Sequence, residues 1–297
     1  MNRHIIIDRL VAQTMAIELG RHIFFADEIE SPSFEDHIDA VTVHVPEITG
    51  EGIYEVSALT LAGELDPAFN VLRWLGPGKP TLIFHHGTAE RPFDTGRGVR
   101  NVFHHMFGGG KLPEANVIVL RAPYHTGTAR AFSARMRRLA NLMAMVSASV
   151  KLIEHLTACC RCENVCVSGI SLGGFIVNIH RAYYNTARAY VPLLAGAAPD
   201  DLFLESRFNV VTGHRALDNH EKVSRIFNFE DAYSRIPDNN VFPLLARHDQ
   251  YVRFERQKAC YGNRSIRALE KGHITGSNAS TDLRNHILGV MDTITTR

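Results

Sequence analysis

The sequence lacks an excess of charge of either sign. Its 297 residues include 32 lysines and arginines against 31 aspartates and glutamates, which gives a formal net charge of +1. A nucleic-acid-binding surface needs basic residues concentrated on one face, whereas the clump of Arg135, Arg137 and Arg138 fits the solvated end of a helix. We therefore expect a small-molecule partner and no nucleic acid.

Long apolar runs and an even set of cysteines are also missing. The isoleucines at positions 5–7 are followed by Asp8 and Arg9, so this run is too short for the apolar core of a secretory signal. No later run reaches the roughly 18 apolar residues of a membrane span. Four of the five cysteines are crowded within positions 159–166, which makes a poor disulfide framework. These absences predict a cytoplasmic protein with no membrane span and with reduced thiols.

Metal-binding motifs are absent as well. The crowded cysteines lack the two separated C-x-x-C pairs of a zinc site, and Cys166 falls in a predicted core strand. His104, His105 and His125 are not set in an H-E-x-x-H frame. We expect neither a metal nor an organic cofactor.

What the chain does contain is apolar sequence in short runs. Hydrophobic residues make up 45% of it, enough for a large core, and we interpret residues 1–297 as one α/β domain. Residues 1–62 predict an N-terminal helix and a lead-in hairpin of two half-buried strands, at 39–45 and 53–61, near a sheet edge. Seven apolar runs then alternate with helical patterns, which is typical of strands buried on both faces of a sheet. These runs lie at residues 71–75, 82–84, 117–120, 165–167, 190–194, 242–245 and 265–269.

Two longer segments between these runs have patterns of their own. Apolar residues recur at three- and four-residue steps between positions 131 and 160, which predicts the longest helix, with its apolar stripe on the sheet. Residues 198–240 contain no clean strand and mix acidic, amide, arginine and phenylalanine residues, a composition that indicates short surface helices. We interpret this second segment as a helical cap insertion over a site.

The apolar run at 165–167 leads into Gly-Ile-Ser-Leu-Gly at 169–173, a G-x-S-x-G motif between a predicted strand and a predicted helix. A serine on such a tight turn has a strained backbone, and Gly169 and Gly173 leave it room because they lack a Cβ. The turn projects the Ser171 hydroxyl above the sheet, and the following helix presents the Leu172 amide to an oxyanion. Ser171 is therefore the candidate nucleophile.

Further motifs follow three other predicted strands. The run at 82–84 continues into His86 and Gly87, and the run at 242–245 continues into a turn that contains Asp249. The last run, at 265–269, is followed by His273. The chain order is therefore a serine, then an aspartate, then a histidine, each just after a strand.

In these four motifs, over roughly residues 70–297, the chain resembles the α/β-hydrolase superfamily, in which the triad has this order. The resemblance implies a mostly parallel central sheet flanked by helices. It implies that His273 is the base, that Asp249 orients it, and that the Leu172 and Thr88 amides form the oxyanion hole. Gly87 then lets the chain turn, and we expect His86 to pack against its own loop without transferring protons.

The implied activity is that of a serine hydrolase, carboxylesterase-like, which cleaves an ester or similar acyl compound through an acyl-enzyme intermediate. Two alternatives stay open. One is a non-catalytic α/β-hydrolase-fold module that binds a small ligand or a protein, and the other is a peptidase or haloperoxidase-like activity. The chain lacks a His-Gly-Gly-Gly run and the histidine that many lipases place before the elbow serine, so we assign no subfamily.

The identity of the acid and the content of the cap also have alternatives. Some members of the superfamily place the acid after the preceding strand, and His248 is a second histidine near the acid turn. In this fold, segments that follow strand ends gather where the serine is exposed, so residues 198–240 should overhang it. Four phenylalanines there either line an acyl pocket or anchor the cap. The rival acids are Asp200, Asp201 and Glu205, and the phenylalanines are Phe203, Phe208, Phe227 and Phe229.

Overall fold

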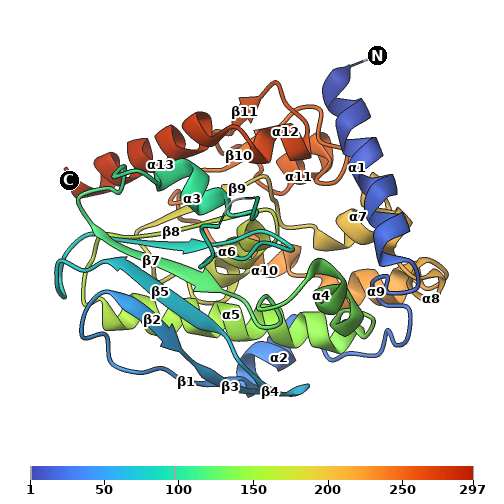
Figure 1. The fold of residues 1–297 in the computed structure, drawn as a ribbon, viewed down its shortest axis with the longest axis horizontal. Helices are drawn as coiled ribbons and strands as arrows, with labels where there is room; N and C mark the ends of the chain where they lie inside the picture. Colours follow the sequence, from blue (N-terminus) through green and yellow to red (C-terminus); the bar gives the residue numbers. More distant parts are fainter. Residues whose placement is uncertain (1, 97, 297) are drawn as a thin grey trace.

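A mixed eight-stranded sheet runs through the middle of the structure, a computed structural model that describes residues 2–96 and 98–296 (Figure 1). Its strands are β2 (Gly52–Glu55), β5 (Ala68–Arg73), β6 (Thr81–His85), β7 (Asn116–Arg121), β8 (Val165–Ile170), β9 (Ala189–Leu193), β10 (Leu244–Ala246) and β11 (Arg267–Leu269). The order is β11-β10-β9-β8-β6-β7-β5-β2, with parallel pairing from β11 to β7 and antiparallel pairing at β5 and β2. Each predicted apolar run overlaps one strand, which confirms the mostly parallel sheet.

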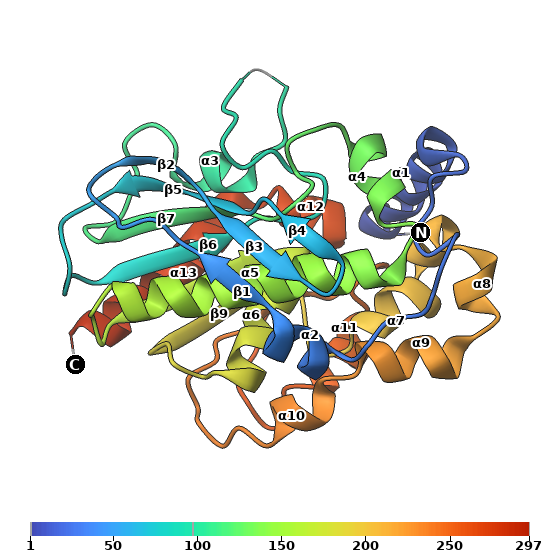
Figure 2. The same ribbon diagram turned by 90° about the horizontal axis from the view of Figure 1, so that it is seen from below.

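Different helices cover the two faces of this sheet (Figures 1 and 2). Alternate residues of a strand point to opposite faces. On β6, Leu82 and Phe84 pack in the core with α3 and α13, whereas Ile83 packs in the core beneath α5 and α6. The helices outside the 198–240 segment are α1 (Arg3–Leu19), α2 (Phe34–Ala40), α3 (Val102–Phe107), α4 (Ala129–Arg135), α5 (Leu139–Cys159), α6 (Leu172–Tyr183), α11 (Phe254–Ala259), α12 (His273–Ser277) and α13 (Ser280–Thr295).

The lead-in strands differ in part from the predicted hairpin. The two predicted segments do pair, because β1 (Thr42–His44) lies antiparallel to β3 (Ser57–Thr60) in a small sheet completed by β4 (Gly63–Leu65). The first half of the second segment, however, is β2, which pairs with β5 at the edge of the large sheet. Val56 between the two halves is buried, and its amide donates to the Pro67 carbonyl. The predicted second strand is therefore two strands in two sheets.

The longest predicted helix, at 131–160, is interrupted. Its first part is α4 and its second part is α5, with a break at residues 136–138. At the break, the carbonyls of Met136 and Arg137 accept hydrogen bonds from the amides of Phe25 and Asp27. The break therefore results from contacts with the N-terminal segment, which a local helical pattern does not reveal.

Helix α5 combines length with an apolar composition. In the described part of the chain it is the one helix long and apolar enough to cross a membrane, with a mean hydropathy of 1.3 over its most apolar window. That window is 72% buried inside the protein. Burial of this extent is that of a core helix, and α5 packs against α2 and α6.

The 198–240 segment consists of short helices, as predicted. It runs along the same side of the molecule as the N-terminal segment (Figure 2), and backbone hydrogen bonds from Phe24 to Val211 and from Gly213 to Phe24 join the two. The sequence pattern did not predict a contact between these two segments. In the structure they form one layer. The elements of the insertion are α7 (Pro199–Leu204), η1 (Arg207–Val211), α8 (His214–Leu217), α9 (His220–Phe227) and α10 (Glu230–Ser234).

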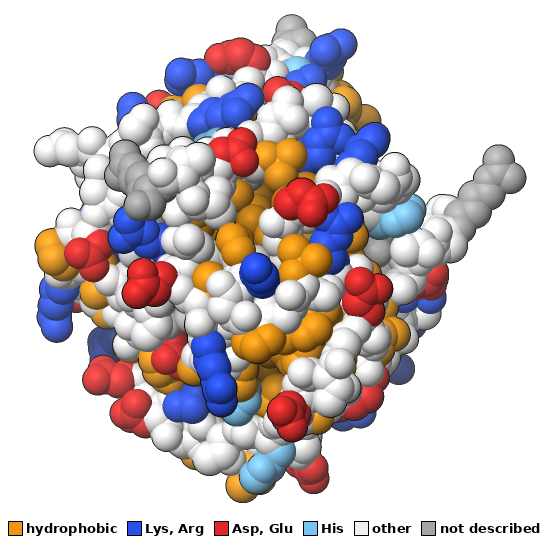
Figure 3. All heavy atoms as spheres, turned by 90° about the vertical axis from the view of Figure 1, so that its left-hand side faces the viewer, with side chains coloured by type: hydrophobic (Ala, Val, Ile, Leu, Met, Phe, Trp, Pro, Cys, Tyr) orange, Lys and Arg blue, Asp and Glu red, His pale blue; other side chains and the backbone are white. Residues whose placement is uncertain are grey.

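Charged side chains of both signs share the surface. Figure 3 shows one face, on which lysine and arginine side chains alternate with acidic ones around apolar atoms. This face therefore has no field of a single sign, as the balanced composition predicts.

Three histidines are buried side by side where β6 and β7 end. The ring centroid of His86 lies 4.8 Å from that of His85 and 4.4 Å from that of His125. Burial lowers the pKa of His85 and of His125 to about 4, and it also lowers the pKa of His86. These side chains are therefore neutral in the folded protein near pH 7.

These histidines make the free energy of unfolding depend on pH. An unfolded histidine binds a proton near pH 6.5, whereas His85 and His125 do so only near pH 4, so their contribution to stability is complete above pH 6.5 and is lost on acidification toward pH 4. Each of these two contributes about 1.4 kcal/mol per pH unit in that window. We expect His125→Phe to reduce the slope by that amount in urea unfolding from pH 4.5 to 7.5, with exposed His44→Phe as the control. An unchanged slope would contradict the assignment.

Candidate active site

Ser171 occupies a tight turn between β8 and α6. Its backbone has φ 53° and ψ −113°, a left-handed conformation that costs a residue with a side chain about 1–3 kcal/mol. The turn is packed tightly, because a Cβ on Gly169 would lie 2.5 Å from the Gly173 carbonyl oxygen. A Cβ on Gly173 would overlap the His85 carbonyl. The glycines of the motif therefore meet a steric requirement, as the sequence predicts.

The structure brings Ser171, His273 and Asp249 into one hydrogen-bonded row. The Ser171 Oγ atom lies 3.0 Å from His273 Nε2, and His273 Nδ1 lies 2.7 Å from Asp249 Oδ2. Both His273 and Asp249 are buried. The carboxylate requires a proton on Nδ1, which leaves Nε2 free to accept the serine proton.

Neighbouring strands explain why the acid and the histidine meet. β10 and β11 pair in parallel, so the loops after their carboxyl ends leave the sheet side by side. Asp249 is held in its loop by the amides of Tyr251 and Val252, which both donate to Oδ1 at 2.8 Å. Burial raises the pKa of the Asp249 carboxyl, and the adjacent His273 opposes that rise by stabilising the carboxylate. Oδ2 remains for the imidazole.

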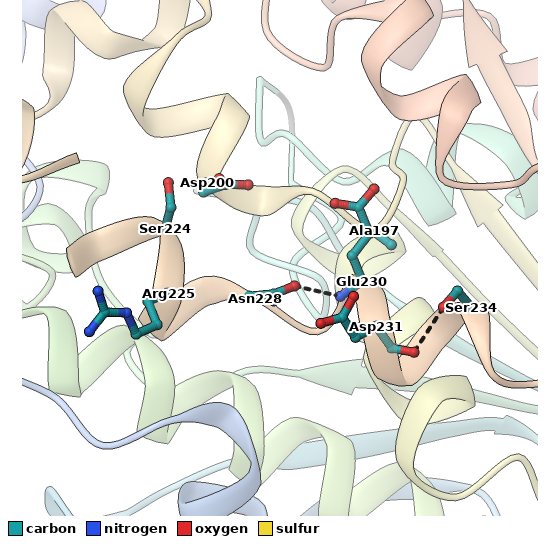
Figure 4. Close-up of a pocket in the computed structure, with 8 residues that line it drawn as sticks. All are labelled: Ala197, Asp200, Ser224, Arg225, Asn228, Glu230, Asp231 and Ser234. Atoms are coloured by element: carbon teal, nitrogen blue, oxygen red, sulfur yellow. Dashed lines mark hydrogen bonds between the residues drawn. The ribbon is translucent and has the colours of Figure 1, made fainter. Parts of the chain in front are cut away.

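The rival acids lie elsewhere. Asp201 forms an ion pair with Arg253, and Glu205 lies 3.2 Å from His220. Asp200 borders a separate polar groove that also contains Glu230 and Asp231 (Figure 4). The carboxylate that lies against the His273 ring is that of Asp249.

The rival histidine, His248, does not contact the serine. Its Nε2 lies 3.1 Å from Glu270, and its ring stacks on that of His4. His273 is therefore the histidine within hydrogen-bonding distance of Ser171.

The loop after β6 is organised by buried polar groups. His86 Nε2 accepts from the Ala122 amide at 3.0 Å, so its proton is on Nδ1, which donates to the Gly87 carbonyl at 2.6 Å. Buried Glu90 accepts the Gly87 amide at 2.9 Å, and a Cβ on Gly87 would lie 2.8 Å from that carboxylate. His86 thus has the structural role predicted from the sequence, and the loop presents Thr88.

The two predicted oxyanion donors belong to residues that line cavities. Thr88 and Leu172 both line an apolar cavity of about 40 Å³, and Thr88 also lines the adjoining cavity of about 70 Å³ that contains Ser171 and His273. Among residues 2–96 and 98–296, neither amide has a hydrogen-bond acceptor. Unpaired N–H groups beside a serine hydroxyl are the donors that an oxyanion requires.

The wall of these cavities comes in part from the insertion. Phe208 and Leu202 line the cavity with Ser171, and Phe203, Phe208 and Phe227 line the apolar one. Phe229 lines neither, because its ring packs between Phe34 and Tyr233. Three of the four phenylalanines thus reach a cavity, whereas Phe229 matches the other alternative, an anchor within the segment.

Several lining residues were not predicted from the sequence. The N-terminal segment supplies Val11 and Met15 to the serine cavity, and Phe24 and Phe34 to the apolar one. Asp8, from α1, accepts hydrogen bonds from the backbone of the two loops that carry Asp249 and His273. In the local sequence, Asp8 is distinguished only as an acidic residue that follows three isoleucines.

The described residues include no group of three His, Cys, Asp or Glu side chains arranged to hold a metal ion. The five cysteines are free thiols, and burial raises the pKa of Cys160 to about 11 and that of Cys166 to about 12.

Comparison with solved structures identifies the fold. Acetyl xylan esterase 1 from a Thermoanaerobacterium species matches with a TM-score of 0.54 and 14% identity, over 92% of this chain and 98% of that one. An acetyl xylan esterase from a Paenibacillus species matches with a TM-score of 0.50 and 12% identity, over 96% and 94% of the two chains. A structure from an analysis of two prolyl endopeptidases matches with a TM-score of 0.52 and 15% identity, over 86% of this chain and 39% of that one.

No family model matches the sequence, and neither does any curated protein sequence. The structural likeness is therefore one of fold. The chain has the α/β-hydrolase fold, as its motifs predict.

Proposed function

We propose that this protein is a serine hydrolase that cleaves an ester or similar acyl compound through an acyl-enzyme intermediate. The observation that supports it most strongly is the row of hydrogen bonds from Ser171 through His273 to Asp249 at the wall of a cavity. The same cavity is lined by Thr88, whose amide has no acceptor among the described residues.

In the proposed reaction, the site residues act once in acylation and once in deacylation. His273 Nε2 takes the proton of Ser171 while Oγ attacks the acyl carbon, and the carbonyl electron pair moves onto oxygen. The Thr88 and Leu172 amides bind that oxyanion, with each donor contributing roughly 3 to 4 kcal/mol in a comparable hydrolase. The imidazolium protonates the leaving group, and water then enters by the same route and releases the acid.

The apolar cavity beside the oxyanion donors supports an apolar acyl group. All of its lining residues except Thr88 are apolar, and seven are phenylalanines. An acyl chain in that cavity leaves its carbonyl carbon beside Ser171 with the oxygen toward Thr88 and Leu172. The proposed substrate is therefore a small apolar acyl ester or thioester, and the free thiols support a cytoplasmic site of action.

The alternative of a non-catalytic binding module explains less of the geometry. Binding does not require a serine with a strained backbone, a histidine fixed in one tautomer and a buried carboxylate in one row. The peptidase and haloperoxidase alternatives are separated from the esterase by a substrate panel of apolar acyl esters, peptide amides and halide with peroxide.

Replacement of the serine tests the nucleophile. We expect Ser171→Ala to fold normally and to lose covalent labelling by a fluorophosphonate, because only an activated hydroxyl attacks that phosphorus. Labelling is measured by intact mass, with Ser168→Ala in the adjacent strand as the matched control. A Ser171→Ala protein that labels as fast as the native one would rule out the assignment.

Replacement of the acid tests the role of the carboxylate. Asp249→Asn keeps the shape of the side chain but favours the wrong imidazole tautomer, so kcat should fall by about 10⁴-fold. Ester hydrolysis is compared with that of Asp201→Asn, which loses an ion pair with Arg253 away from His273. Near-native kcat in Asp249→Asn, with a severe loss in Asp201→Asn, would move the acid to the preceding strand.

Replacement of lining phenylalanines tests the acyl cavity. Phe203→Leu and Phe208→Leu should shift the kcat/KM preference toward longer acyl chains by several-fold, because each removes ring volume from the cavity wall. The rate of fluorophosphonate labelling should stay within about twofold. Phe229→Leu is the matched control, since Phe229 is buried in the same layer but lines neither of these two cavities. Identical preferences in all three variants would refute the acyl cavity.

A further inference from the structure

Asp8 on α1 contacts both loops that carry the catalytic groups. Its Oδ2 accepts hydrogen bonds from the His273 amide at 2.8 Å and from the Gln250 amide at 3.1 Å. Its Oδ1 accepts from the Ile274 amide at 3.0 Å. One carboxylate thus holds the residue after Asp249 and the backbone of His273 itself.

The environment of Asp8 makes these contacts strong. The side chain is 0% exposed, and no Lys, Arg or His forms an ion pair with it among the described residues. A buried carboxylate without a cation must be stabilised by hydrogen bonds, and bonds to an ionised acceptor are the stronger kind. The three amides therefore supply its stabilisation, which ties both loops to one point.

Asp8 connects the two loops beyond the point at which the pairing of β10 and β11 ends. β10 and β11 are joined as far as the bond from the His248 amide to the Lys271 carbonyl, at 2.9 Å. Beyond that point, Asp8 connects the two loops. Gly272 permits its approach, because a Cβ there would lie 2.7 Å from Asp8 Oδ2.

A second set of bonds fixes α1 against the same loops. The Tyr251 hydroxyl donates to the Asp8 carbonyl at 2.5 Å, and His4 Nδ1 lies 2.8 Å from Thr275 Oγ1. The position of the Asp8 carboxylate is therefore set by the helix that carries it.

We propose that Asp8 is a positioning residue, which holds the His273 ring in register with Ser171 and Asp249 through the backbone of both loops. The inference rests on the proposed function. The N-terminal helix is, on this proposal, a component of the catalytic apparatus rather than an appendage.

Kinetics of Asp8→Asn and Asp8→Ala test the proposal. The asparagine keeps the shape but loses the charge and turns N–H groups toward N–H groups, so kcat for a soluble acyl ester should fall at least about tenfold. KM should stay within about twofold, and fluorophosphonate labelling should slow by the same factor as kcat. Glu18→Gln, exposed on the same helix, is the control. Native kcat, or a loss confined to KM, would overturn the proposal.

Gly272→Ala provides a second variant that does not alter Asp8. Its Cβ should displace the carboxylate and lower kcat when Asp8 is present, and it should have much less effect in the Asp8→Ala background. Non-additivity of this kind identifies a direct interaction. Strictly additive losses of kcat would contradict a direct contact between Asp8 and the loop that contains Gly272.

Hydrogen exchange separates this inference from the proposed function. If the native protein neither labels with fluorophosphonate nor hydrolyses esters, the proposed function fails. The contact between the Asp8 carboxylate and the two loops is then tested by amide exchange in residues 248–252 and 271–276. Faster exchange in Asp8→Asn than in Glu18→Gln supports the contact, and equal exchange overturns it.

Discussion

The backbone of Ser171, held at φ 53° between a strand and a helix, is the constraint on which the site depends. The turn is possible only because β6, β8 and α6 approach within the space that Gly169 and Gly173 leave empty. That close packing directs the hydroxyl toward the carboxyl edge of the sheet and leaves the Leu172 amide without an acceptor among the described residues. The strain at one residue thus sets the position of both the proposed nucleophile and a proposed oxyanion donor.

The remaining groups reach this point because parallel strands end at one edge of the sheet. Asp249 and His273 follow adjacent strands, and Thr88 follows β6, next to the strand that carries Ser171. The N-terminal segment and the 198–240 segment both line the cavities beside Ser171, and they are joined to each other through Phe24. α1 also contributes Asp8, so the element that covers the site also braces its loops. On this proposal, α1 both lines the cavity beside Ser171 and aligns the loops that carry Asp249 and His273.

The sequence was sufficient for features that depend on local pattern. Buried strands have nearly continuous apolar runs, and the serine, aspartate and histidine motifs each follow such a run, so the sheet and the row of site residues could be predicted. Asp8 could not, because its partners lie more than 240 positions away. The break at 136–138 likewise arises from distant backbone partners, and the split of the 53–61 segment arises because its first half pairs with β5. The direction in which Phe229 points depends on Phe34, from another part of the chain.

The most direct test of the central claim is a crystal structure of the protein after reaction with an alkyl fluorophosphonate. Such an adduct has the geometry of the tetrahedral intermediate. The predicted structure has phosphorus bonded to Ser171 Oγ, the phosphoryl oxygen between the Thr88 and Leu172 amides, and the alkyl chain in the cavity lined by Phe203 and Phe208. Phosphorus bonded to another residue, or a phosphoryl oxygen turned away from both amides, would contradict it.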